Sequence, residues 1–435
     1  MQVVVVGGGS TGEHFVGALR RLDDEVGLSL VESRLVGGEC SYWACMPTKT
    51  MLRPLEALAA ARRAPGVRGG ELDPAAVLAW RDTVAERDDT SQVAWLTEQR
   101  CALLRGRASV LTPGVVSVDG RELPYDRLVI ATGSAPAIPD IPGLEQVDYW
   151  TNVEATEALA LPSSLLVLGG GPVGCELAQF FARVGTRVTL VQSDARLLPR
   201  IDPDAAALVE ASLVEDGVEL LLGSGIERFD GPTSALLAGS GERRSFERLL
   251  LATGRRPSLG GLDGLPLTIS RRGIEVDGRL RAAPSVWAIG DVTGIAPFTH
   301  VGKYQARVAA YDMAGREASA DYRAVPATIF TDPQVATVGR LEGRISTWPL
   351  RSTPRLSTYE RPKRDGFLKI AADPQRRVVN GAVAVGPEAG EWLQQLTLAI
   401  RAQTSIEVLL DVIQPYPTFS EAVFLGLREL NLDLD

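Results

Sequence analysis

Metal-binding and nucleophilic side chains are scarce in this chain of 435 residues. It holds four cysteines, two histidines and four lysines, the last beside 41 arginines. A structural zinc site needs about four ligands, so His14, His300 and a single close cysteine pair predict no metal site. No apolar run approaches about 18 residues, and 54 acidic against 45 basic residues give a net charge of −9. These features argue against a membrane-spanning segment and against nucleic acid or an anionic membrane as the main partner.

A secretory signal is not expected either, because Met1–Gly7 runs straight into an apolar strand without a basic segment. The chain is therefore predicted to be a soluble cytoplasmic protein of two or three domains. In a reducing compartment, a close cysteine pair is redox-active or metal-binding more often than a structural cross-link.

Cys40 and Cys45 form that pair, within the run Gly37–Lys49. Positions five apart in a regular helix are separated by about 8 to 9 Å, whereas a disulfide needs Cα atoms within about 7 Å. A bridge therefore requires an interrupted helix start, with Gly37 and Gly38 providing the bend. Two buried core thiols are the alternative interpretation.

A dinucleotide-binding fingerprint opens the chain. The β-branched run Val3–Val6 predicts a buried parallel strand, and a helix and a second strand, Leu28–Val31, follow. That strand ends in Glu32, which is expected to accept hydrogen bonds from an adenosine ribose. The fingerprint glycines, which let the backbone approach a pyrophosphate at the helix N-terminus, are Gly7, Gly9 and Gly12.

The pattern recurs about 160 residues later along the chain, a spacing that is read directly from the two fingerprints. Here the strand Arg187–Val191 ends in Gln192 rather than in an acid. Two such units predict two dinucleotides, a bound flavin and a nicotinamide coenzyme. Without a carboxylate at position 192, the repulsion toward a 2′-phosphate is absent, and Arg196 and Arg200 lie a few residues further along the chain. Both features favour NADPH over NADH. If both arginines face solvent, the choice of coenzyme stays open. The second set of fingerprint glycines is Gly169, Gly171 and Gly174.

Two near-identical turns follow buried strands, at 128–133 and 249–254. Thr132 and Gly133 are expected at the flavin, and Gly254 at the nicotinamide coenzyme. Asp291, directly after another strand, either hydrogen-bonds a ribityl hydroxyl or caps a helix. These repeated strand–helix–strand units predict an α/β fold with two Rossmann-like domains.

Together these motifs resemble those of the class I pyridine nucleotide–disulfide oxidoreductases, the family of dihydrolipoamide dehydrogenase, glutathione reductase and mercuric reductase. The resemblance covers essentially the whole chain and implies FAD, a nicotinamide coenzyme and a homodimer. It implies that Cys45 lies nearest the flavin and forms a charge-transfer thiolate, while Cys40 attacks the substrate. It also implies that Lys49 pairs with Glu176 beside the flavin N5 atom.

The resemblance also predicts the domain organisation. An FAD-binding domain is expected in two parts, 1–145 and 259–322, with a helical insertion at about 50–107. An NAD(P)-binding domain is expected at 146–258. A C-terminal α+β dimerisation domain is expected at 323–435.

The C-terminal His–Glu pair of that family is altered in this chain. Glu421 keeps the glutamate, but Tyr416 stands where the histidine, the acid–base group for the interchange thiol, belongs. Tyrosine has an ordinary pKa of about 10, so it is a poor base at pH 7 but can donate a hydrogen bond. Mercuric reductases share the tyrosine but carry a C-terminal cysteine pair, which this chain lacks. Between the cysteines, Tyr42 and Trp43 either reshape the substrate mouth or pack beneath it.

The sequence thus predicts an FAD enzyme that passes two electrons from NAD(P)H through the flavin and the Cys40–Cys45 disulfide to a small acceptor. One alternative is a non-disulfide acceptor, such as a quinone, a metal ion or a thioether-type compound. A second is a dithiol oxidase that runs in reverse. A third is a flavoprotein kept as a binding component, against which the intact cysteines, Lys49 and Glu176 argue.

Overall fold

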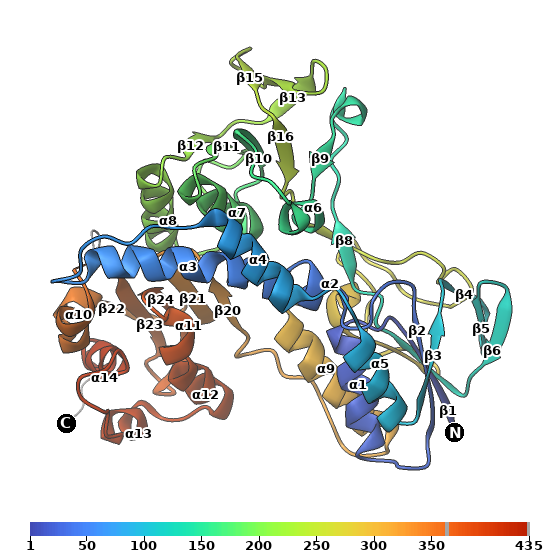
Figure 1. The fold of residues 1–435 in the computed structure, drawn as a ribbon. Helices are drawn as coiled ribbons and strands as arrows, with labels where there is room; N and C mark the ends of the chain where they lie inside the picture. The colour runs from blue at the N-terminus through green and yellow to red at the C-terminus, as the bar shows by residue number, and fades with distance from the viewer. Residues whose placement is uncertain (362–364, 433–435) are drawn as a thin grey trace. The chain divides into compact units, whose positions relative to one another are not determined.

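The computed structural model describes residues 1–361 and 365–432 (Figure 1). They fall into two compact units. The first unit consists of Met1–Pro47, Arg81–Ala137 and Gly254–Asp321, and the second of Thr48–Trp80, Ile138–Thr253 and the chain from Tyr322 onward. Within the described ranges, no helix is both long enough and apolar enough to span a bilayer.

The first unit is built on a six-stranded sheet with the order β18-β19-β7-β1-β2-β3. Its central strand β1 (Gln2–Val6) runs parallel to β2 (Gly27–Glu32) and to β7 (Arg127–Ile130). Val3, Val4 and Val5 are fully buried, as expected for a parallel strand covered on both faces. The remaining strands of this sheet are β3 (Cys101–Arg105), β18 (Arg281–Ala283) and β19 (Val286–Ala288).

Helix α1 (Ser10–Arg20) packs closely on α9 (Thr299–Met313). Gly302 permits this contact because it has no side chain; a Cβ there would overlap the hydroxyl of Thr11. A short helix, η2, covers Gly290–Thr293. The other elements of this unit are α2 (Gly38–Tyr42), α5 (Thr90–Glu98), the antiparallel strands β4 (Ala108–Thr112), β5 (Val115–Val118) and β6 (Arg121–Pro124), and the pair β8 (Ser134–Pro136) and β17 (Arg255–Pro257).

The segment expected to be helical as far as about residue 107 is helical only in part. Helices α3 (Cys45–Arg63) and α4 (Pro74–Ala85) each run from one unit into the other, and α5 ends at Glu98. Residues Cys101–Arg105 instead form β3, which pairs in parallel with β2. The prediction of helix was wrong there, because the backbone hydrogen bonds of a sheet edge outweigh the local pattern.

The second unit contains a parallel sheet with the order β12-β11-β10-β16-β9. Its centre is β10 (Ser164–Leu168), which is flanked by β11 (Arg187–Gln192) and β16 (Arg248–Leu251) and followed by helix α7 (Pro172–Arg183). The other elements are η1 (Leu144–Gln146), β9 (Tyr149–Trp150), α6 (Asn152–Glu157), α8 (Pro203–Glu215), β12 (Glu219–Leu222), β13 (Ile226–Phe229), β14 (Ser234–Leu237) and β15 (Arg243–Ser245).

The C-terminal part of this unit is an antiparallel sheet with the order β20-β21-β24-β23-β22, and helices follow its last strand. Two sheets with parallel central strands and dinucleotide-binding topology, plus this antiparallel sheet, confirm the predicted fold class. The predicted domain boundaries stay predictions. The elements are β20 (Pro326–Ile329), β21 (Gln334–Gly339), β22 (Arg344–Pro349), η3 (Leu350–Ser352), α10 (Pro354–Tyr359), β23 (Phe367–Asp373), β24 (Val378–Gly386), α11 (Ala389–Trp392), α12 (Gln394–Ala402), α13 (Ile406–Asp411) and α14 (Glu421–Arg428).

Candidate active site

The cysteine segment is an interrupted helix that lies against the first fingerprint. Cys40 lies in α2, and Cys45 is the first residue of α3. Gly37 and Gly38 have φ values of 113° and 66°, which side chains rarely adopt. The Gly37 N–H donates to the Gly8 carbonyl at 2.8 Å, and a Cβ on Gly38 would come within 2.7 Å of a backbone carbon of the fingerprint. The two glycines therefore provide the predicted bend and bring the thiol segment onto the dinucleotide loop.

The aromatic residues between the cysteines pack beneath the segment. Tyr42 and Trp43 are 2% and 6% exposed, and their rings meet edge to face at 5.5 Å. The Tyr42 hydroxyl donates to the Val36 carbonyl at 2.8 Å, and the Arg34 guanidinium lies 3.8 Å from the Trp43 ring centroid. Of the two interpretations left open by the sequence, packing is the one that these contacts support.

The two thiols interact with each other and with the start of α9. Cys40 and Cys45 are both partly exposed, and a hydrogen bond links their side chains. The Cys45 Sγ atom lies 3.6 Å from the Thr299 hydroxyl. The hydrogen bond with Cys45, and then burial, raises the pKa of the Cys40 thiol, while Thr299 and Lys303 act in the opposite direction. Cys40 therefore holds its proton firmly and needs a base before it can act as a nucleophile.

The first dinucleotide cradle fits FAD by its chemistry. The Gly8 N–H donates to Glu32 Oε2 at 2.8 Å, so the carboxylate lies at the residue between the first two fingerprint glycines, Gly7 and Gly9. Helix and strand can approach closely because Gly12 has no side chain; a Cβ there would overlap the Gly7 carbonyl oxygen. The backbone at Gly9 is left open for a pyrophosphate, since a Cβ there would meet nothing closer than 3.9 Å.

Asp291 lies in the first turn of η2 but does not cap that helix, whose N-cap is Ile289. Its Oδ2 atom accepts from the Ser134 hydroxyl at 2.7 Å. Arg255 donates to the same hydroxyl at 2.7 Å and to Glu39 Oε2 at 2.6 Å, within the cysteine segment. This chain of contacts was not predicted from the sequence, where only the position of Arg255 directly after Gly254 could have suggested it. Thr132 donates to the Ser258 carbonyl, and Thr132, Gly133 and Gly254 all lie in the first unit.

The second cradle repeats the first with one change of charge. A Cβ on Gly174 would overlap the Gly169 carbonyl oxygen, as in the first fingerprint. The Gly170 N–H donates to Gln192 Oε1 at 2.8 Å, and Gln192 Nε2 donates to Asp194 Oδ2 at 2.6 Å. A carboxylate therefore stands two residues beyond the position where the acid is missing. The remaining predicted residue, Gly171, is the N-cap of α7, and a Cβ there would meet nothing within 4 Å.

Arg196 is committed to the protein backbone. Its guanidinium donates to three carbonyl oxygens in the loop that follows β11, at 2.7 to 3.0 Å. These contacts hold the loop in shape and use three of the five N–H donors of the guanidinium, so fewer donors are left for a 2′-phosphate. The carbonyls belong to Leu198, Pro199 and Ile201.

Lys49 and Glu176 form an ion pair within the second unit. Lys49 Nζ lies 2.6 Å from Glu176 Oε2, and the Glu176 side chain is only 5% exposed. The other carboxylate oxygen accepts from the Phe330 N–H at 2.9 Å, and the Phe330 ring centroid lies 4.9 Å from the ammonium. The structure thus brings together two residues that the sequence paired, and it adds Phe330, which the sequence did not single out.

Tyr416 and Glu421 are not joined by a hydrogen bond in the described part of the chain. Tyr416 is 73% exposed on the segment before α14, and Glu421 begins that helix. Among the described residues, the buried Oε2 atom of Glu421 has no hydrogen-bond partner. The other two cysteines, Cys101 and Cys175, are both buried.

Two dinucleotide folds, a thiol pair on the first glycine loop and a C-terminal antiparallel sheet are typical of a dinucleotide-dependent redox protein. The chain belongs to the pyridine nucleotide–disulphide oxidoreductase family, whose description matches residues 1–317. The dimerisation domain of the same family matches residues 325–425.

Relatives and a solved structure agree with this assignment. The chain is 30% identical to a mercuric reductase of Lysinibacillus sphaericus, over 100% of this chain and 83% of that protein. It is 32% identical to a dihydrolipoyl dehydrogenase of Thermus scotoductus, over 99% and 97%. The crystal structure of LpdA from Mycobacterium tuberculosis matches with a TM-score of 0.87 and 26% identity, over 99% of both chains. The protein is an FAD-dependent NAD(P)H disulfide oxidoreductase, and its dimerisation domain supports a homodimer.

Proposed function

We propose that this protein reduces a small disulfide acceptor with electrons that pass through Cys40 and Cys45. The observation that carries this proposal is the thiol pair itself, half-buried and hydrogen-bonded to the backbone of the FAD-type glycine loop through Gly37. Bound FAD would supply hydride acceptance from the nicotinamide and transfer of two electrons to the disulfide. Glu32 and Asp291 are the side chains proposed to hold its ribose and ribityl hydroxyls.

The exchange steps belong to the two thiols. Cys40, once deprotonated, attacks one sulfur of the acceptor disulfide, which forms a mixed disulfide and releases the first thiolate. Cys45 then attacks Cys40, which restores the Cys40–Cys45 disulfide and releases the second thiolate. Each acceptor disulfide thus takes two electrons, and the two product thiolates take up two protons.

We propose that Tyr416 donates a hydrogen bond to the leaving thiolate rather than acting as a general base. Its exposure on the dimerisation domain supports a role toward a partner subunit. Because Cys40 holds its proton firmly and no imidazole stands at position 416, disulfide substrates whose leaving thiolate needs a proton from the enzyme are disfavoured. This observation favours, as a second candidate, a non-disulfide two-electron acceptor such as a quinone or a metal ion. Reverse operation as a dithiol oxidase uses the same groups.

The choice of nicotinamide coenzyme is a separate proposal. Arg196 and Arg200 favour NADPH in the sequence, but three of the five N–H donors of Arg196 bind backbone carbonyls, which hold its guanidinium in the loop. The Asp194 carboxylate, bonded to Gln192, adds a repulsion toward that phosphate. We therefore propose NADH as the preferred coenzyme, with Gln192 and Asp194 together facing the adenosine ribose.

Anaerobic titration of the purified protein with NADH and then with NADPH tests the proposal. A long-wavelength thiolate-to-flavin charge-transfer band at two electrons is the expected result. Plain two-electron reduction of flavin without that band would remove the redox role of Cys40 and Cys45. The coenzyme that reduces the flavin at lower concentration identifies the physiological donor class.

A further inference from the structure

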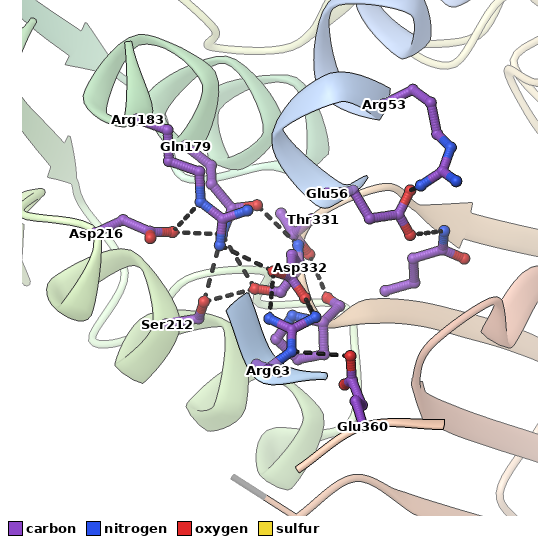
Figure 2. Close-up of polar contacts among 12 residues, drawn as sticks. Arg53, Glu56, Arg63, Gln179, Arg183, Ser212, Asp216, Thr331, Asp332 and Glu360 are labelled. Atoms are coloured by element: carbon purple, nitrogen blue, oxygen red, sulfur yellow. Dashed lines mark hydrogen bonds and ion pairs between the residues drawn. The ribbon is translucent and has the colours of Figure 1, made fainter. Parts of the chain in front are cut away.

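The turn between β20 and β21 is held on two sides by helices of the second unit (Figure 2). On α7, three side chains face the turn at a spacing of three and four residues, which places them on one stripe of the helix. Glu176 accepts from the Phe330 N–H at 2.9 Å. Gln179 accepts from the Asp332 N–H at 2.8 Å and donates to its carbonyl at 3.1 Å, and Arg183 lies 3.0 Å from Asp332 Oδ2.

Helix α3, which begins at Cys45, contacts the same turn with side chains spaced seven residues apart. This spacing also keeps them on one face of a helix. Lys49 lies over the Phe330 ring, and Glu56 accepts from Gln334 Nε2 at 3.1 Å. Arg63 forms a two-pronged pair with Asp332, at 2.8 and 3.1 Å, a geometry that fixes orientation as well as charge.

Asp332 is therefore the fixed point of the turn. Burial acts to raise its pKa, but the Arg63 hydrogen bonds and the Arg183 charge outweigh burial and hold that pKa below its usual range. Its backbone is fixed as well, because the Ser212 hydroxyl donates to its carbonyl at 2.5 Å. Thr331 between Phe330 and Asp332 is only 1% exposed. A segment so constrained can hold the Phe330 ring in one place.

We propose that this turn positions the Lys49–Glu176 ion pair for flavin chemistry, and that Phe330 is the positioning residue. The Phe330 N–H holds one oxygen of the Glu176 carboxylate, and the ring face attracts the Lys49 ammonium that binds the other oxygen. Both partners of the pair are thus oriented by one residue. This inference rests on the proposed function and on the place beside the flavin that the family resemblance implies for Lys49, which follows Cys45 by four residues in α3.

The effect on the flavin follows from the charge of Lys49. An ammonium near the isoalloxazine stabilises the anionic reduced flavin, so its loss or displacement makes reduction harder. Replacing Phe330 by leucine keeps apolar bulk and the backbone N–H but removes the ring face. Phe330→Tyr keeps the ring and is the matched control.

The test measures the flavin midpoint potential and the rate of flavin reduction by NADH and NADPH in the holoenzyme. Phe330→Leu is expected to slow reduction about tenfold and to lower the midpoint potential by about 30 mV, the two-electron equivalent of tenfold. Phe330→Tyr is expected to match the wild type, and both Phe330 variants should keep the wild-type melting temperature. In a Lys49→Met background, Phe330→Leu should add no further shift.

An unchanged potential in Phe330→Leu, or the same shift with and without Lys49, would overturn the inference and leave the turn as a purely structural clamp. Failure of the proposed function gives a different result. In that case neither coenzyme reduces the wild-type flavin, while the potential from dye equilibration still reports the coupling between Phe330 and Lys49.

Discussion

Gln192 occupies the position of Glu32 in the second cradle, and it accepts from Gly170 at the same 2.8 Å at which Glu32 accepts from Gly8. The chain thus contains an internal comparison between two cradles with the same glycine geometry. They differ in where the negative charge lies: on the residue at the strand end in the first, and two residues further along, on Asp194, in the second.

Replacing Asp194 by asparagine is expected to weaken discrimination against NADPH. The carboxylate is absent in this variant, so the repulsion toward a 2′-phosphate is lost, and the NADH to NADPH ratio of kcat/KM should fall about tenfold, mainly through the KM for NADPH. Steady-state kinetics with both coenzymes measure this ratio. Asp140→Asn, at an exposed position outside both cradles, is the control. A wild type that prefers NADPH, or an unchanged ratio in Asp194→Asn, contradicts the NADH proposal.

Single serine variants of the two cysteines should separate the roles of the thiols. Before any reductant is added, Cys40→Ser is expected to show the charge-transfer band, because it cannot form the disulfide and its Cys45 thiolate faces oxidised flavin, whereas Cys45→Ser should not show it. Two-electron reduction of Cys40→Ser should then reduce the flavin and remove the band, since the disulfide that would take the electrons is missing. In both variants the rate of disulfide reduction should fall by at least about a hundredfold. Absorbance spectra under argon and a disulfide assay provide the measurements. Quinone reduction that persists in Cys40→Ser at the wild-type rate would identify direct transfer from the flavin.

Introducing an imidazole at position 416 should test the missing base. Tyr416→His is expected to raise disulfide turnover about tenfold or more near pH 7, since general acid–base catalysis contributes about 10² to 10⁴. The gain should require Glu421, whose Oε2 atom has no hydrogen-bond partner among the described residues. Tyr416→His combined with Glu421→Gln is therefore expected to return to the wild-type rate. Tyr416→Phe, if indistinguishable from wild type, would remove the proposed hydrogen bond to the thiolate.

Stability should fall between about pH 4.5 and 7 because of Glu13 in the first turn of α1. Burial, with Asp89 adding to it and Lys303 opposing it, raises the pKa of Glu13 to about 7. A carboxyl whose folded pKa is raised stabilises the fold fully below its unfolded pKa and loses that contribution as the pH rises through its folded pKa. Glu13→Gln should flatten this profile and add up to about 3 kcal/mol at pH 8. Denaturant unfolding at several pH values measures it, and parallel profiles for both proteins would contradict the assignment.

The strands of both parallel sheets could be predicted because runs such as Val3–Val6 and Ser164–Leu168 are apolar on both faces. The glycine fingerprints could also be predicted from the sequence. The close approach of strand and helix permits no Cβ at Gly12 or Gly174, so glycine is required at those positions. The strand conformation of β3 could not be predicted from the local sequence, because its hydrogen bonds are made to β2, more than 60 residues away in the chain.

Several site contacts escaped prediction for the same reason. Three contacts join residues that are more than 150 positions apart in the sequence, so no local spacing predicts them. They are Thr299 with Cys45, Arg255 with Glu39, and Phe330 with Glu176. Lys49 and Glu176 were paired only through the family resemblance. Their role beside the flavin stays a prediction.

The absence of side chains at Gly37 and Gly38 sets the depth of the thiol segment on the first glycine loop. Because main-chain atoms meet there directly, the spacing between the sulfur pair and the dinucleotide loop is independent of the residues around the acceptor. Protein engineers could therefore vary position 416 or the exposed surface around Cys40 to change the acceptor and keep the route by which electrons enter. On the proposed electron path, the entry of electrons and their delivery to the acceptor would therefore depend on different parts of the chain.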